Sequence, residues 1–162
     1  MRYLIEDFSP GKHRARLQKL LLSPESSAEI RRVKPEFMTD EQFVYLCLET
    51  SEESRVFIHR ATGRICGAFG YTFGVFKGHI SVCPWFLSDG FERKDPMFFL
   101  KVSKAIVNKW LREIPTKHWG NVCLADPRII KWLRYLGFTV DAHRCFMEAG
   151  SAFCEFYLEA EE

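Results

Sequence analysis

The sequence predicts a single domain with an α+β fold, in which helices pack on a mixed sheet. Three stretches carry this prediction. Strand-like alternation with a period of two runs from Arg55 to Leu87, and an amphipathic helix is expected over Met97–Ile114. Between Trp119 and Phe138 the chain reads as a buried strand, a short helix and a second strand. Strands and helices in this arrangement are typical of layered α+β proteins.

Length and composition are those of a globular domain covering residues 1–162. The chain is 47% hydrophobic and 15% aromatic, which indicates a core rich in rings. Its formal net charge of +2 is near balance, so composition does not indicate a general role on nucleic acid or membrane surfaces. No apolar run approaches the roughly 20 residues of a membrane span. We find no repeat or linker.

The N-terminal third is expected to hold one strand and then helices. Arg2–Phe8 reads as the strand, and Lys12–Leu22 as a short amphipathic helix. Ser23–Ser27 is expected to break this helix, with Ala28–Lys34 as a continuation beyond the break. The polar start at Thr39 predicts a further helix through Leu48.

The middle of the chain is expected to form a three-stranded antiparallel meander. Arg55–Arg60 pairs with Ile65–Phe73, and the latter pairs with Gly78–Leu87. Pro84 removes a ladder donor, which predicts an edge, a bulge, or a strand that splays from its neighbour. Three glycines of the second strand are expected at bends or close contacts: Gly67, Gly70 and Gly74.

In the C-terminal third, Trp119–Ala125 reads as a buried strand without helical periodicity. Asp126 and Pro127 then form a helix start, with an N-cap acceptor and a proline in the first turn. Gly137 lies where a left-handed C-terminal residue belongs. The chain closes with an expected hairpin of Arg144–Met147 and Ala152–Leu158.

The six cysteines all lie in apolar segments and form no C-x-x-C pair. The first residues carry charges inside their apolar run, so we expect no signal peptide. Reduced, metal-free thiols in a reducing compartment are therefore expected, in preference to disulfides or a zinc site.

The stretch Trp119–Phe138 resembles the last strand–helix–strand segment of the GNAT superfamily of acyl-CoA-dependent N-acyltransferases, which ends in a short helix followed by Gly-Phe. The predicted order of elements is also that of GNAT proteins. The resemblance implies a mixed, mostly antiparallel sheet with helices on both faces and a splayed central strand pair, in which Trp119–Ala125 lies parallel to Gly78–Leu87. GNAT enzymes often have asparagine before this helix and tyrosine four residues before the glycine, where this chain has Asp126 and Leu133.

The same resemblance locates a coenzyme loop. GNAT enzymes bind the pyrophosphate of coenzyme A on backbone N–H groups of a loop patterned R/Q-x-x-G-x-G/A. Here the loop, residues 88–96, reads SDGFERKDP, with one glycine and with acids that would repel a pyrophosphate. If acetyl-CoA binds, the resemblance assigns it to Trp85, Phe86, Leu87, Ser88, Gly90, Arg93, Lys94 and Arg128.

Three residues are candidates for catalysis, each with a structural alternative. Asp126 would orient the substrate amine or the coenzyme, but helix capping also explains it. Tyr135 would protonate the leaving thiolate, but it lies two positions late, about 200° around the helix from the family's tyrosine. Asp89 would act as a base through a water molecule. His59 and His79 are further candidate bases, and no metal site is expected.

A narrower resemblance is to the GNAT-like internal virion proteins of short-tailed phages. It rests on W-F-x-x-S-D at Trp85–Asp89, on the aromatic strand Trp119–Val122 and on the helix Ile129–Gly137. The chain also has more aromatic rings than its core needs, which suggests a cleft or an interface among Trp85, Phe86, Phe91, Trp110 and Trp119.

Two functions follow from these resemblances. The first is a phage-encoded GNAT-fold protein with a degenerate coenzyme site. It would need no cofactor, would bind a virion or host protein, and would lie in the host cytoplasm or the virion interior. The alternative is an acetyl-CoA-dependent N-acetyltransferase acting on an unidentified amine. The sequence does not decide whether the protein is an enzyme, and it names neither substrate nor partner.

Overall fold

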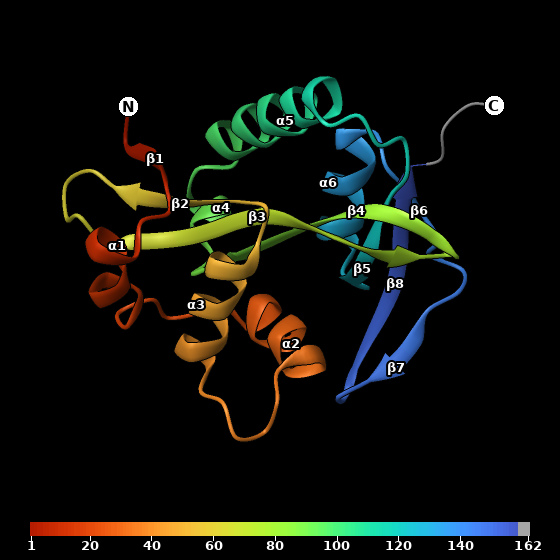
Figure 1. The fold of residues 1–162 in the computed structure, drawn as a ribbon, viewed down its shortest axis with the longest axis horizontal. Helices are drawn as coiled ribbons and strands as arrows, with labels where there is room; N and C mark the ends of the chain where they lie inside the picture. The colour runs from red at the N-terminus through yellow and green to blue at the C-terminus, as the bar shows by residue number, and fades with distance from the viewer. Residues whose placement is uncertain (159–162) are drawn as a thin grey trace. The chain divides into compact units, whose positions relative to one another are not determined.

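The computed structural model describes residues 1–158, which form eight strands and six helices (Figure 1). In chain order these are β1 (Tyr3–Asp7), α1 (Pro10–Leu17), α2 (Pro24–Val33), α3 (Asp40–Thr50), β2 (Glu53–His59), β3 (Ile65–Phe76), β4 (His79–Ser88), α4 (Phe91–Lys94), α5 (Pro96–Glu113), β5 (Trp119–Leu124), α6 (Pro127–Leu136), β6 (Thr139–Val140), β7 (Phe146–Glu148) and β8 (Ser151–Leu158).

The chain folds into two compact units that share β3 and β4. The first unit contains residues 1–72 and 84–91, and the second contains residues 73–83 and the described chain from residue 92 on. The hydrogen-bonded strand order is β1-β2-β3-β4-β5-β8-β6, with β7 also on β8. The predicted α+β class with a mixed, mostly antiparallel sheet is therefore confirmed.

In the first unit, β2 lies between β1 and β3 and is antiparallel to both. This confirms the predicted pairing of the first two strands of the meander. Helix α3 contacts α1, α2 and β2, so the three helices bury the apolar residues of this part of the sheet. The buried core residues include Leu17, Ile30, Val44, Leu48, Val56, Ile58, Ile65, Ala68 and Leu87.

The predicted break between two helices occurs, but at residues 18–23 and not over Ser23–Ser27, because Ser23 is the N-cap of the second helix. Its hydroxyl accepts the N–H of Ser26 at 3.2 Å, and Pro24 occupies the first helical position. Helix α1 ends at Leu17, and α2 begins anew at Pro24. The start predicted at Thr39 is confirmed as a reciprocal capping box with Gln42.

A buried histidine joins β1 to α1. His13 accepts the N–H of Ser9 at 2.9 Å on Nδ1, so its proton lies on Nε2, which is 2.9 Å from a Glu6 carboxylate oxygen. Lys12 lies 2.7 Å from the same oxygen. Hydrogen bonds from Lys12 and then His13 lower the pKa of Glu6. The network leaves both ring nitrogens of this fully buried side chain hydrogen-bonded.

In the second unit, β8 holds three strands together. It pairs antiparallel with β5 along one edge and with β6 and β7 along the other. Strand β4 is parallel to β5, as predicted, with Val82 opposite Trp119. Among the described residues this is the single register pair that the two strands share, which is the behaviour expected of a splayed pair. The proline-containing part of β4 begins two residues beyond it.

Aromatic rings form the core of the second unit. Trp119 stacks on Trp110 with ring centroids 6.5 Å apart, and Phe138 lies against both Trp119 and Phe156. The ring of Phe76 occupies the space above Gly120 that a side chain would fill. Trp110 and Trp119 are 3% and 2% exposed, so they are core residues and do not line an open surface.

Two tight turns complete the predicted hairpins. Lys77 and Gly78 join β3 to β4, and Ala149 and Gly150 join β7 to β8, with positive φ at all four residues. This is the conformation of type I′ turns, which match the twist of antiparallel strands. Gly137 ends α6 at φ 103°, as predicted. No helix among residues 1–158 is long and apolar enough to cross a membrane.

We predict that Gly70→Ala destabilises the protein by about 1–3 kcal/mol, the cost of forcing atoms into a packed site. A Cβ at Gly70 would collide with the backbone oxygen of Glu53 and lie 3.0 Å from the ring of Trp85. Gly11→Ala is the matched control, because Gly11 lies in α1 with nothing within 4 Å of the added carbon. It should be neutral or stabilising by about 0.5–1 kcal/mol. Urea unfolding of both variants measures the difference, and equal stabilities would contradict the close contact.

The single domain remains a prediction, and its test is cooperativity. Because β3 and β4 run through both units, neither unit keeps its strands if the other unfolds. We expect one calorimetric transition whose van't Hoff enthalpy equals the calorimetric enthalpy. Two resolved transitions would show that the two units are separate domains.

Candidate functional site

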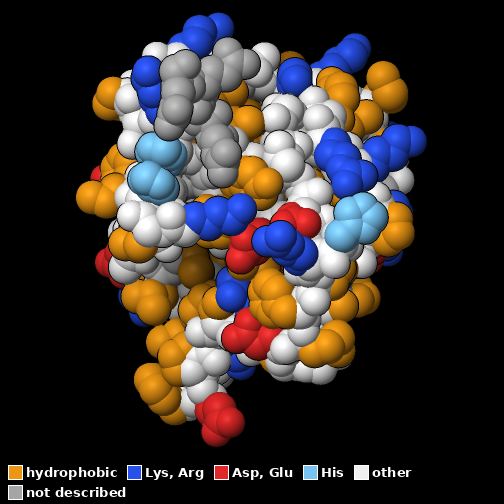
Figure 2. Space-filling view, turned by 90° about the vertical axis from the view of Figure 1, so that its right-hand side faces the viewer, with side chains coloured by type: hydrophobic (Ala, Val, Ile, Leu, Met, Phe, Trp, Pro, Cys, Tyr) orange, Lys and Arg blue, Asp and Glu red, His pale blue; other side chains and the backbone are white. Residues whose placement is uncertain are grey.

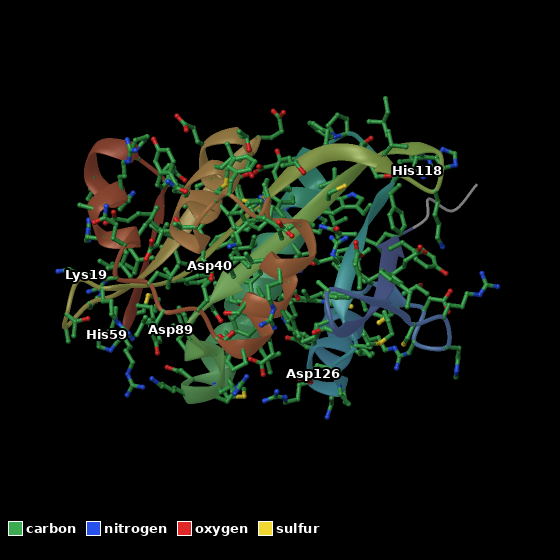
Figure 3. The ribbon with its side chains drawn as sticks, turned by 90° about the horizontal axis from the view of Figure 1, so that it is seen from below. Lys19, Asp40, His59, Asp89, His118 and Asp126 are labelled. Atoms are coloured by element: carbon green, nitrogen blue, oxygen red, sulfur yellow. The ribbon has the colours of Figure 1, made fainter. Side chains whose placement is uncertain are left out.

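The candidate coenzyme loop is short in the structure. Strand β4 ends at Ser88, Asp89 and Gly90 form a turn, and α4 begins at Phe91 (Figure 3, where Asp89 is labelled). Asp95 then caps α5, accepting the N–H of Phe98 at 3.4 Å. Gly90 has φ 92°, which makes it the one position of this turn that needs glycine.

Four consecutive backbone N–H groups at this turn already donate hydrogen bonds within the protein. The donor–acceptor pairs are Ser88 N–H to Ser26 Oγ at 2.9 Å, Asp89 N–H to the Cys66 carbonyl at 2.9 Å, Gly90 N–H to Ser88 Oγ at 3.1 Å, and Phe91 N–H to Asp89 Oδ1 at 3.0 Å. An anion at this turn would need to replace one of these acceptors for every donor that it used. In this conformation all four donors are therefore used within the protein.

The carboxylate of Asp89 is held on both of its oxygens. One accepts the N–H of Phe91, and the other lies 2.7 Å from Nη2 of Arg64. The Asp89 side chain is 5% exposed, and that of Arg64 is 42% exposed. Arg64 thus compensates the charge of a nearly buried acid, which is the usual condition for keeping a carboxylate in such a place.

The three side chains before the turn pack within the first unit. Trp85 donates from Nε1 to Ser51 Oγ at 2.8 Å and lies against the core, while Leu87 is buried. The ring of Phe86 lies 6.2 Å from that of Phe57 and 6.3 Å from that of Phe91. The structure therefore brings Phe86, Leu87, Ser88, Asp89 and Gly90 together around one packed strand end.

The basic residues that were predicted to bind the coenzyme lie on two helices, α4 and α6. Arg93 and Lys94 are exposed on α4. Arg128 folds back on Asp126, with Nη2 2.8 Å from Oδ2 and Nε 3.2 Å from Oδ1. The Asp126 carboxylate also accepts the Arg128 N–H at 2.8 Å, which caps α6. Hydrogen bonding from the Arg128 side chain lowers the pKa of Asp126.

Tyr135 and Asp126 lie at opposite ends of α6. Tyr135 is nine positions after Asp126, roughly 13 Å along the helix axis. Tyr135 is 46% exposed, and Lys104 donates to its carbonyl at 2.9 Å. Leu133, at the position of the family's tyrosine, is buried in the core. The two proposed catalytic residues are thus not neighbours on this helix.

The two candidate histidines have aromatic or polar neighbours. His59 lies edge-on to Tyr3 and 3.4 Å from the Thr62 hydroxyl. His79 is exposed and stacks on His118 with centroids 4.3 Å apart. No group of three or more His, Cys, Asp or Glu suited to a metal ion occurs in the described part of the chain.

Sequence reasoning missed the residues that close the turn, namely Ser23, Ser26 and Arg64. Ser23 donates its N–H to the Ser88 carbonyl at 2.8 Å, beside the contact from Ser26 to the N–H of Ser88. The sequence S-P-E-S carries the signal of an N-cap followed by a proline, which would have identified Ser23 as a helix start. No local pattern indicated that this helix start would meet the end of β4.

Comparison with known proteins identifies the fold. No protein-family model and no curated protein matches the chain. Among solved structures, the ribosomal-protein-S5-alanine acetyltransferase of Vibrio fischeri matches with a TM-score of 0.66 and 11% identity, over 100% of this chain and 95% of that one. A GNAT-family acetyltransferase of Bacillus anthracis matches with a TM-score of 0.60 and 13% identity, over 98% and 93%. The spermidine N-acetyltransferase of Vibrio cholerae, solved with CoA and spermine, matches with a TM-score of 0.63 and 12% identity, over 97% and 95%.

These matches cover nearly the whole chain at low identity. The chain therefore has the fold of the GNAT acetyltransferases. The resemblance to phage internal virion proteins is not supported by these matches and stays a prediction.

We predict that Asp126→Ala destabilises the protein by about 0.5–2 kcal/mol, because it removes the cap of α6. Asp126→Asn keeps a capping acceptor and should cost less. Since the folded pKa of Asp126 is lowered, the contribution of its charge is complete above the unfolded pKa of about 3.9 and is lost as the pH falls through the folded pKa. Unfolding measured across acid pH should therefore show the gap between wild type and Asp126→Asn closing. A gap that stays constant would contradict a structural role for the charge.

Proposed function

We propose that this GNAT-fold protein has a degenerate coenzyme site and acts by binding another protein, rather than as an efficient acyltransferase. The observation that carries the proposal is the turn at Ser88–Phe91. Its four N–H groups donate within the protein, whereas a coenzyme pyrophosphate needs such donors directed at it.

The affinity that a ligand would lose here follows from the number and strength of these internal hydrogen bonds. A hydrogen bond in a folded protein contributes about 0.5–1.5 kcal/mol net. Replacing four of them would cost a ligand about 2–6 kcal/mol, which is roughly 30-fold to 20,000-fold in affinity. The buried acid Asp89 also lies at the turn, although Arg64 compensates its charge. Weak coenzyme binding is the expected result.

The proton donor of the family's reaction is also missing from its position. Leu133 is 4% exposed, and its side chain has no proton that it could donate. Tyr135 carries a phenol, but it lies at the end of α6 away from the N-terminus that Asp126 caps. The loop and this position together support a protein that keeps the fold without the family's chemistry.

A protein partner is supported by the surface of the β3–β4 hairpin. Phe73, Val75 and Ile80 are 47%, 78% and 70% exposed in the second unit. Figure 2 shows a face on which hydrophobic side chains lie exposed among Lys, Arg, Asp and Glu. Exposed apolar side chains of this size are common at protein interfaces. We extend the proposal to a virion or host protein as the partner, in the virion interior or the host cytoplasm, on the basis of the sequence resemblance alone.

The second candidate is an acetyl-CoA-dependent N-acetyltransferase acting on an amine. It is favoured by the fold and by the single register pair between β4 and β5. In this case acetyl-CoA is the cofactor, the backbone of Trp85–Leu87 and the groups of Ser88, Gly90, Arg93, Lys94 and Arg128 hold it, and Asp89, Asp126 and Tyr135 are the residues to test for catalysis.

Titration calorimetry with acetyl-CoA separates the two functions. We expect a dissociation constant of about 1 mM or weaker for this protein, with the Vibrio cholerae spermidine N-acetyltransferase as a positive control in the same buffer. Micromolar binding would overturn the degenerate-site proposal. Asp126→Ala and Tyr135→Phe would then be assayed for amine acetylation, and loss of turnover at unchanged coenzyme affinity would establish the enzyme.

A further inference from the structure

Three cysteines of the second unit occupy one row across its strands. Cys123 on β5 is the register partner of Cys154 on β8. On the other edge of β8, Phe146 of β7 is opposite Phe153, so the next position of the same register places Cys145 opposite Cys154. Directly opposed residues of an antiparallel pair project from the same face of the sheet. Cys154 therefore has a cysteine on each side.

The contacts agree with this register. The sulfurs of Cys123 and Cys154 are 3.7 Å apart, and both side chains are buried, at 3% and 0% exposure. Burial raises the pKa of the Cys154 thiol, and the neighbouring Cys145 thiol raises it further. Cys145 is exposed and donates to the Ala142 carbonyl at 3.2 Å. The row thus runs from an accessible thiol to two buried ones.

We propose that Cys145 and Cys154 form an oxidation site, in which a peroxide converts the exposed Cys145 thiol to a sulfenic acid and Cys154 then closes a disulfide. No disulfide is present among the six cysteines of the structure, so this is the reduced state. Opposed residues in an antiparallel pair have Cα atoms roughly 4.5–5.5 Å apart, which lies within the range that a disulfide requires.

The reaction balances with one peroxide. The Cys145 sulfur attacks a peroxide oxygen, the O–O bond breaks, and one water leaves after protonation. The Cys154 sulfur then attacks the Cys145 sulfur, the S–O bond breaks, and a second water leaves. Two thiols supply two electrons, and hydrogen peroxide is reduced to two waters.

Cys123 gives the disulfide a second position. Its sulfur is 3.7 Å from that of Cys154, so thiol–disulfide exchange can break the Cys145–Cys154 bond and form Cys123–Cys154. The Cys145 thiol is then regenerated at the surface. Either bond would tie β8 covalently to a neighbouring strand. This site is independent of the turn at Ser88–Phe91 and of the proposed function.

The test is peroxide titration of the full-length, reduced protein with equimolar hydrogen peroxide. After denaturation in N-ethylmaleimide, peptide mass spectrometry counts the alkylated thiols and identifies linked peptides. Wild type should lose two thiols and gain a dithiothreitol-reversible link between Cys154 and either Cys145 or Cys123. Cys83→Ser, which removes a half-buried cysteine of β4, is the matched control and should form the same link.

Cys145→Ser removes the accessible thiol and should slow formation of the link about tenfold or more, because buried thiols react poorly.

Three results would overturn the proposal. In the first, wild-type Cys145 ends as sulfinic or sulfonic acid without a linked peptide. In the second, Cys145→Ser forms a Cys123–Cys154 link as fast as wild type. In the third, non-reducing electrophoresis shows the oxidised protein as disulfide-linked dimers. In wild type, the peptide map decides the first result and electrophoresis decides the third, even if the variant fails to fold.

Discussion

The length of β3 and β4 is the constraint on which the rest of this structure depends. These strands have 12 and 10 residues, about twice the common strand length of 5–6. A two-residue turn joins them, and each contributes to both units. Strand β2 pairs with the first part of β3, and β5 joins β4 at Val82. Glycine at position 70 lets the backbone of β2 approach β3 without a collision.

At the end of β4, the backbone N–H groups donate hydrogen bonds within the protein rather than to a ligand. A buried helix start has N–H groups that must be satisfied, and a buried strand end has both N–H and C=O groups that must be satisfied. The start of α2 and the end of β4 satisfy each other, because Ser23 donates to the Ser88 carbonyl and Ser88 donates to the Ser26 hydroxyl. The same hydrogen bonds that stabilise this junction remove donors from any ligand. Internal acceptors and any external acceptor would therefore compete for the same donors at this turn.

In the second unit, the placement of the cysteines depends on strand register. The β5–β8 and β7–β8 pairings both bring cysteines to the level of Cys154. A shift of one residue in either pairing would turn the cysteine on that strand to the other face of the sheet. The row of cysteines is thus a property of strand pairing, and the reduced, metal-free thiols expected from the apolar segments stay a prediction.

The sequence by itself determined the features whose causes are local. The capping box at Thr39, the N-cap at Asp126 and the left-handed Gly137 depend on residues within about four positions, and all were predictable. The N-cap at Ser23 had an equally local signal, and it was misinterpreted as a break. The resemblance over Trp119–Phe138 supplied the parallel pairing of β4 with β5.

Tertiary structure decided what lies between distant segments. Ser26 and Ser88 are 62 residues apart in the chain, and the Arg64–Asp89 pair and the row of cysteines likewise join separate strands or loops. No periodicity or cap rule encodes such contacts, because they depend on strand register and on which helix start packs against which strand end. For this reason the element order of the fold was predictable from the sequence, whereas the hydrogen-bond partners of the turn at Ser88–Phe91 were not.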